Sequence, residues 1–116
     1  MSDRNDKISI LQICVSNPQD ILQLVDYTEN SIVSKTILDK PAGTITLFAF
    51  DAGQKLSEHT APYNAVVQVL DGTAKLSIGE QSVSVPAGQL IIMPANVPHG
   101  VFAQEKFKML LTMIRS

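Results

Sequence analysis

The chain has 116 residues, of which 45% are hydrophobic and 17% are charged, and this length is typical of one globular domain. Its 9 Lys and Arg residues against 11 Asp and Glu residues leave a formal net charge of -2, without the basic excess that binding to a phosphate backbone requires. We therefore expect no nucleic-acid partner. The charged fraction lies below the ~25% typical of soluble domains, which favours association between copies of the chain.

Signals for export or membrane insertion do not occur in the sequence. Residues 1–7 are polar and are not followed by the apolar h-region of a signal peptide, and the single cysteine, Cys14, excludes a disulfide within the chain. No run approaches the ~18 apolar residues of a membrane-spanning helix. We therefore expect a cytoplasmic protein with no membrane partner, made of a polar tail over residues 1–7 and a single domain over residues 8–116. Cys14 itself is interpreted as a small buried hydrophobic residue.

The first part of the chain predicts one strand and one helical turn. The apolar run over residues 8–15 is typical of a β-strand. After it, Asn17 as an N-cap and Pro18 at the first helical position predict a short helical turn over residues 20–24.

From residue 32 onward the sequence consists of short β-rich runs, separated by turn residues about every eight to twelve positions. Asp71-Gly72 between two apolar runs is a signal for a hairpin. The pattern predicts an all-β fold, either an antiparallel barrel or a two-sheet jelly roll. An immunoglobulin-like sandwich is the alternative, but the chain has no Trp and only one Cys for the usual core of that fold. The predicted strands cover residues 32–39, 44–50, 57–61, 65–70, 73–78, 81–85, 89–93, 99–104 and 107–114.

Two stretches resemble the two conserved motifs of the cupin family. The first family motif runs Gly, five residues, His-x-His, three or four residues, Glu, six residues and Gly. Its first glycine, first histidine and last glycine match Gly53, His59 and Gly72. The second motif carries Pro-x-Gly, a hydrophobic strand, a turn with Pro and a His, and it matches the stretch from Pro86 to His99. The resemblance implies an all-β cupin (RmlC-like) jelly-roll β-barrel.

The resemblance also implies where a metal would bind. The four ligands of metal-binding cupins fall on His59, Ala61, Ala65 and His99, and the two alanines lack donor side chains. Catalytic zinc sites normally keep three protein ligands, and non-haem Fe(II) oxygenases keep two His and a carboxylate. The chain therefore predicts, at most, one divalent transition metal of unknown identity in a centre reduced to His59 and His99.

Replacement ligands are few. Strand alternation turns Glu58 away from the face of His59, and the same parity places Gln68 on the face opposite Ala65, so we expect neither as a ligand. Tyr63 and Asn64 lie in a turn, where alternation gives no direction, and either one is a candidate third donor.

The two alanines are also smaller than the His and Glu that they replace, and a cavity left in the core lowers the stability of the folded state by about 24 cal/mol per Å³. Either larger neighbours close this space or a ligand occupies it. We predict an interior pocket with His59 and His99 as its polar groups and Tyr63, Met93 and Phe48 as candidate lining residues. Most apolar residues on these strands are expected to belong to the hydrophobic core of the barrel and not to a pocket. Such a pocket suits a small, mostly apolar ligand with one acceptor or anionic group.

Three functions remain open at this point. One is a metal-dependent enzyme with a two-His centre, such as the dioxygenases, isomerases and decarboxylases of the family. The second is a metal-free small-ligand-binding or sensor protein with a vestigial metal site, and the third is an assembly unit with a vestigial interior. The resemblance also implies a homodimer, and we expect the apolar run 8–15 in its interface, as an exchanged strand.

Overall fold

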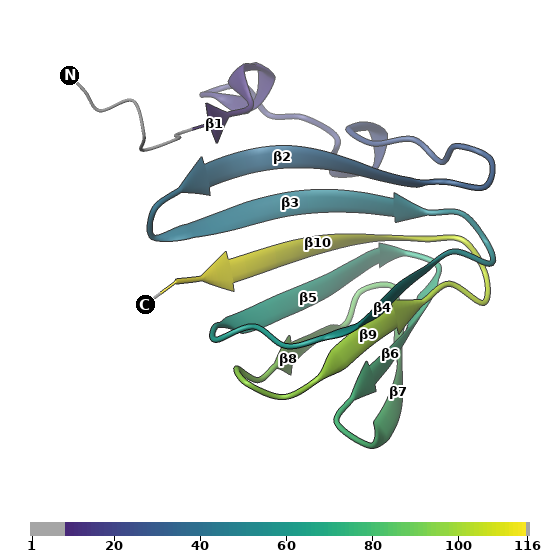
Figure 1. Cartoon of the computed structure of the whole chain (residues 1–116). Coiled ribbons are helices and arrows are strands. Elements are labelled where there is room, and N and C mark those ends of the chain that lie inside the picture. The colour runs from purple at the N-terminus through teal and green to yellow at the C-terminus, as the bar shows by residue number, and fades with distance from the viewer. Residues whose placement is uncertain (1–8, 116) are drawn as a thin grey trace.

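The computed structural model describes residues 9–115, which form two antiparallel β-sheets (Figure 1). In the larger sheet β10 (Phe107–Ile114) lies between β3 (Gly43–Phe50) and β5 (Asn64–Asp71), so the last strand pairs with two strands from earlier in the chain. The predicted tail, residues 1–7, lies outside the described residues. The larger sheet has the order β1 (Ser9–Ile10), β2 (Ile32–Lys40), β3 (Gly43–Phe50), β10 (Phe107–Ile114), β5 (Asn64–Asp71) and β8 (Leu90–Met93). The smaller sheet has the order β4 (Lys55–His59), β9 (His99–Phe102), β6 (Thr73–Ile78) and β7 (Gln81–Pro86).

Each strand predicted from residue 32 onward is present, and the all-β prediction is confirmed. The boundaries of β4 differ from the prediction, because this strand ends at His59 rather than at residue 61. Pro62 limits the strand on this side, since a proline has no backbone N–H to donate to a strand ladder.

The prediction of a hairpin at Asp71-Gly72 is wrong. β5 and β6 belong to different sheets, and the chain crosses from one sheet to the other at this point. Gly72 adopts a φ of +72°, which glycine tolerates without a steric penalty. The tight two-residue connection is instead at Gly79 and Glu80, between the paired β6 and β7.

The N-terminal strand is much shorter than the predicted run 8–15. Only Ser9–Ile10 pairs with β2, and the chain then turns into the 3₁₀ helix η1 (Gln12–Cys14). Residue 8 lies outside the described residues. Beyond Ile10 one further backbone hydrogen bond joins this segment to β2, from the N–H of Leu11 to the carbonyl oxygen of Ile37 at 2.9 Å.

The predicted helical turn over residues 20–24 is the 3₁₀ helix η2 (Ile21–Gln23). Its N-cap is Asp20 rather than Asn17, because the Asp20 carboxylate accepts a hydrogen bond from the backbone N–H of Leu22 at 3.2 Å. The Asn17 side chain is used elsewhere and donates to the carbonyl oxygen of Ile13.

The main hydrophobic core lies between the two sheets. Alternation along each strand turns every second side chain into this space, as for the buried Val67 and Val69 on β5. The rings of Phe50 and Phe107 stack there with centroids 4.6 Å apart. The buried members of this core are Phe50, Ala65, Val67, Val69, Ala74, Leu76, Val85, Met93, Val101, Ala103, Phe107 and Met109.

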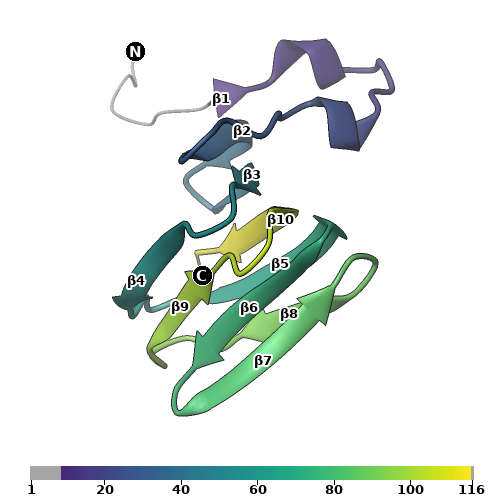
Figure 2. The ribbon, with the colours of Figure 1, turned by 90° about the vertical axis from the view of Figure 1, so that its right-hand side faces the viewer.

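A second core lies on the opposite face of the larger sheet. The segment over residues 11–30 covers part of this face, and its Val25 packs with Leu47 and Ala49 of β3. Figure 2 shows this segment at the end of the molecule away from the β6–β7 hairpin. Cys14 is half-buried and lines an apolar cavity of about 270 Å³ under the segment.

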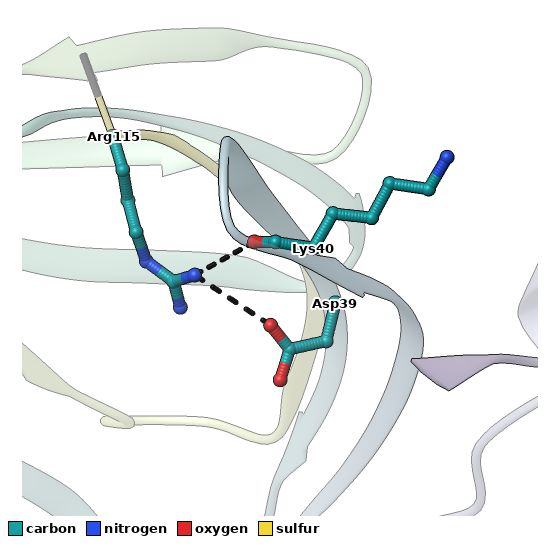
Figure 3. Close-up of polar contacts among 3 residues, drawn as sticks. All are labelled: Asp39, Lys40 and Arg115. Carbon is teal, nitrogen blue, oxygen red and sulfur yellow. Dashed lines mark hydrogen bonds and ion pairs between the residues drawn. The ribbon is translucent and has the colours of Figure 1, made fainter. Parts of the chain in front are cut away.

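The end of β10 is tied to the turn between β2 and β3 (Figure 3). The guanidinium of Arg115 donates to the carbonyl oxygen of Lys40 at 2.8 Å and lies 3.6 Å from the carboxylate of Asp39. No helix over the described residues 9–115 is long and apolar enough to span a membrane.

Candidate functional site

The structure brings His59 and His99 together at one end of the smaller sheet. His59 is the last residue of β4, His99 is the first residue of β9, and the two are direct cross-strand partners. Their ring centroids lie 4.6 Å apart with an interplanar angle of 65°, an edge-to-face arrangement. Ile78 of β6 is the cross-strand partner of His99 on its other side. The two imidazoles therefore form one polar pair next to an apolar neighbour.

A β-bulge in β4 decides the direction of His59. Leu56 pairs with Val101 and His59 with His99, so β4 advances three residues while β9 advances two. Leu56 packs against the main core, and regular alternation from it would bring Glu58, not His59, to the core side. The extra residue of the bulge turns His59 to the side of His99 instead.

Both rings are held by the same kind of hydrogen bond. The Nδ1 atom of His59 lies 3.1 Å from the carbonyl oxygen of Ser57, and Nδ1 of His99 lies 3.1 Å from the carbonyl oxygen of Val97. Because a carbonyl oxygen only accepts, each Nδ1 carries the hydrogen, and each Nε2 is left for another partner. These two carbonyl contacts had no signal in the sequence, because any residue type supplies a backbone oxygen.

The two histidines differ in burial. His59 is exposed, whereas His99 is 5% exposed. Among the described residues no buried side-chain nitrogen or oxygen lacks a hydrogen-bond partner, and the hydrogen bond of the His99 ring is at Nδ1. The Nε2 atom of His99 therefore keeps contact with solvent.

The two alanines at the remaining family positions do not contribute donors. Ala61 lies beyond the end of β4, and its carbonyl oxygen accepts a hydrogen bond from the backbone N–H of Asn96 at 2.8 Å. Ala65 is 2% exposed and lies opposite the buried Met93 on β8. The space near Ala65 is therefore enclosed by the main core.

Other candidate donors face elsewhere. The Oδ1 atom of Asn64 accepts a hydrogen bond from the backbone N–H of Ala95 at 2.8 Å, which ties the turn before β9 to β5. Glu58 lies on the outer face of the smaller sheet, where its Cγ atom is close to Gly100. Gln68 is the partner of the exposed Leu90, on the face of β5 away from the main core.

The residues present do not complete a metal site. No group of three or more His, Cys, Asp or Glu side chains suited to a metal ion occurs within residues 9–115. Two imidazoles fall one ligand short of catalytic zinc sites and of the two-His, one-carboxylate iron sites. The donor set therefore fits no resident metal held by protein ligands alone.

The three predicted lining residues lie in different surroundings. Met93 is 3% exposed in the main core, and Phe48 packs at the edge of that core, 6.0 Å from the ring of Phe50. Tyr63 is half-buried in the turn between β4 and β5. None of the three lines the cavity of about 270 Å³ under residues 11–30 or a second hollow of about 650 Å³ on the smaller sheet. A pocket shared by these residues and the histidines stays a prediction.

Comparisons with known proteins agree with the architecture. A family model described as a cupin domain matches residues 46–115. A conserved protein of unknown function from Streptococcus pyogenes is 34% identical with a TM-score of 0.84, and the match covers 87% of this chain and 89% of that chain. A cupin 2 conserved barrel domain protein from Leptotrichia buccalis is 39% identical with a TM-score of 0.79, over 81% of this chain and 46% of that chain.

A solved structure of lower sequence identity shares the fold of this chain. A cupin superfamily protein from Desulfitobacterium hafniense is 23% identical with a TM-score of 0.82, over 86% of this chain and 92% of that chain. No curated protein matches the chain. The family match begins within β3 and extends through β10, so it includes both histidines and the whole smaller sheet. The resemblance found in the sequence is confirmed, and this chain belongs to the cupin family, with its jelly-roll β fold.

Proposed function

We propose that this cupin binds a small molecule whose polar group is held by His59 and His99, without a resident metal. The observation that carries the proposal is the pair of 3.1 Å contacts from Nδ1 to backbone carbonyl oxygens, because they leave both Nε2 atoms for a ligand. A neutral ring accepts a hydrogen bond at Nε2, and a protonated ring donates one. A hydroxyl group therefore suits the pair in either protonation state.

The surroundings favour an apolar body for this ligand. His99 lies between His59 and Ile78 in one cross-strand row, and Ile78 packs against the main core. Small-molecule sites are usually apolar with a few placed polar groups, and two imidazoles beside an aliphatic residue match that composition. The ligand class that we propose is a small alcohol or diol with an aliphatic ring or chain.

The experiment is a titration of the ¹⁵N-labelled protein with cyclohexane-1,2-diol, followed in amide spectra. We expect shifts at His59, His99 and their neighbours, with a dissociation constant of the order of 1–10 mM for so small a probe. The double variant His59→Ala/His99→Ala should lose these shifts. Ser82→Ala, on the other face of the smaller sheet, is the matched control and should keep them. Equal shifts in the double variant, or none in the wild type, would exclude this site.

A second candidate function rests on one specific observation. Histidines that bind metals usually donate their other ring N–H to a carbonyl or carboxylate, and both histidines here are held in that way. A divalent metal at the pair would need further donors from a bound small molecule, as in a metal-dependent enzyme whose substrate completes the site. Elemental analysis of protein purified without chelator or affinity nickel tests this. Stoichiometric metal that is lost in the double variant would favour the enzyme, and metal-free protein would favour the ligand-binding function.

We also propose a homodimer, and we keep the cytoplasmic location proposed from the sequence. The support for the dimer is the exposed apolar surface of the N-terminal segment, where Ile13 is 54% and Val15 is 50% exposed. Exposed apolar patches of this kind mark interaction surfaces in soluble proteins. In sedimentation velocity the wild type should be a dimer, and Ile13→Ser/Val15→Ser should be a monomer with unchanged unfolding. A monomeric wild type would exclude this proposal.

A further inference from the structure

The outer face of the smaller sheet carries a hollow that no part of the His59–His99 site explains. Its volume is about 650 Å³, and it is lined by residues from all four strands of that sheet and by Gln104, which follows β9. Figure 2 shows these strands side by side in the order β4, β9, β6 and β7. Its lining residues are Lys55, Leu56, Ser57, Glu58, Lys75, Leu76, Ser77, Ser82, Val83, Ser84, Gly100, Val101, Phe102 and Gln104.

The strand register arranges the first row of this hollow. Phe102 is the cross-strand partner of Lys55 on one side and of Lys75 on the other, and Lys75 is in turn the partner of Ser84. Directly opposed residues have Cβ atoms about 4.5–5.5 Å apart, so one phenyl ring stands between two lysine side chains. Phe102 is 44% exposed, and it is the only aromatic among the exposed large hydrophobic residues of the described chain.

The second row leaves space beside this ring. Gly100 is two residues before Phe102 on the same face, and its partner on β6 is Ser77, which pairs with Ser82 of β7. A Cβ atom at Gly100 would lie 3.0 Å from Oγ of Ser77 and 3.3 Å from Cγ of Glu58. Any side chain at this position would therefore fill the bottom of the hollow, which we call its floor. The glycine keeps the floor open, and two serine hydroxyls line it.

The charges favour an anion. The Nζ atom of Lys75 donates to Oγ of Ser84 at 2.8 Å, which positions the ammonium group and leaves two of its three donors. Within residues 9–115 the one ion pair joins Asp39 to Arg115, so neither lysine of the hollow is neutralised by a described carboxylate. Glu58 is the single acidic residue in the lining. Two cations against one anion give this hollow a positive charge on a chain of net charge -2.

We propose that this hollow is a second binding site, for a small organic anion that carries a flat apolar ring. The ring lies on Phe102 above the open floor at Gly100, and the anionic group, a phosphate or a carboxylate, lies between Lys55 and Lys75. Ammonium groups bind phosphates and carboxylates through charge-assisted hydrogen bonds. Because Phe102 and His99 alternate on β9, this site and the histidine pair lie on opposite faces of one strand and do not share side chains.

The test uses phenyl phosphate as the probe, titrated into the ¹⁵N-labelled full chain and followed by amide shifts. We expect saturable shifts at Ser77, Gly100 and Phe102, with a dissociation constant of about 0.1–3 mM. The variants Lys75→Met and Phe102→Ser should each weaken binding about 5- to 10-fold. Lys35→Met removes an exposed lysine from β2, outside the hollow, and should bind like the wild type.

Two further probes separate the ring from the charge. Inorganic phosphate has the charge without the ring, benzyl alcohol has the ring without the charge, and each should bind at least about 10-fold more weakly than phenyl phosphate. Equal binding of inorganic phosphate would reduce the site to a patch of surface charge and overturn the proposal. Shifts confined to the histidine face, or binding unchanged in Lys75→Met and Phe102→Ser, would also overturn it. Amide spectra of each variant without ligand, unchanged beyond the substituted position, show that lost binding is not lost folding.

Discussion

The ammonium group of Lys108 donates a hydrogen bond of 2.6 Å to the carbonyl oxygen of Leu22, which lies 86 positions earlier in the chain. Lys108 is only 8% exposed, and its Nζ atom also lies 5.0 Å from the centre of the Tyr27 ring. A buried lysine is stable only where its charge is paired or hydrogen-bonded, and here a backbone carbonyl and an aromatic face provide this. The contact fastens the N-terminal segment to β10.

Removal of this contact should loosen the N-terminal segment. Hydrogen bonds to charged groups contribute about 1.5–3 kcal/mol, and we expect Lys108→Met to lower the free energy of unfolding by about that amount in urea titrations. Amide exchange should accelerate over residues 20–27 in particular. Lys106→Met is the control, because Lys106 is exposed and its Nζ atom lies over the same Tyr27 ring, 4.9 Å from its centre. An equal loss in both variants would contradict the importance of the carbonyl contact.

The stability of the protein should depend on pH through Tyr27. Burial, and then the 2.6 Å hydrogen bond from its hydroxyl to Asp71, raise the pKa of Tyr27 well above its ordinary value of about 10. The folded chain therefore keeps this proton where the unfolded chain releases it, so stability falls as pH rises through about 10 and beyond. Urea unfolding between about pH 9 and 11 should show a steeper fall for the wild type than for Tyr27→Phe. Parallel pH profiles would show that the phenol is not responsible.

Two glycines with positive φ should differ sharply when they are replaced by alanine. Gly72 and Gly53 have φ values of +72° and +89°, and an alanine in that region costs about 1–2 kcal/mol at either position. A Cβ at Gly72 would also overlap the carbonyl oxygen of Lys106 and lie 3.0 Å from Cβ of Phe107, whereas nothing lies within 4 Å at Gly53. Gly72→Ala should therefore be about 2 kcal/mol more destabilising than Gly53→Ala in thermal unfolding. Similar losses would mean that the crossing between the sheets adjusts easily.

The tautomers of the two histidines give a direct test of the candidate site. The carbonyl contacts require the hydrogen on Nδ1 of both His59 and His99 when the rings are neutral. Long-range ¹H–¹⁵N spectra of the neutral rings should therefore show an unprotonated Nε2 in both. The single variants assign the signals, since each removes one ring. A proton on Nε2 of either ring would remove the basis for a ligand at the pair.

Much of the fold could be predicted from the sequence because it depends on local patterns. The turn residues and β-rich runs located each strand after residue 32, and Gly53, His59, Gly72 and His99 indicated the cupin family. The N-terminal segment was predicted less well, because an edge strand and 3₁₀ turns depend on what they pack against. Asp71-Gly72 was misread for a similar reason, since a turn signal does not say which sheet the next strand joins.

The sequence by itself determined the strand pattern, the family and the presence of two histidines at positions where the family binds metals. Only the tertiary structure decided how those positions are used. The bulge in β4 turns His59 toward His99, and backbone carbonyls at Ser57 and Val97 orient both rings. The same is true of the outer hollow, where Lys55 and Phe102 lie 47 positions apart in sequence but become direct partners by register. Strand alternation is a property of neighbouring residues, whereas bulges and register depend on pairing between strands distant in sequence.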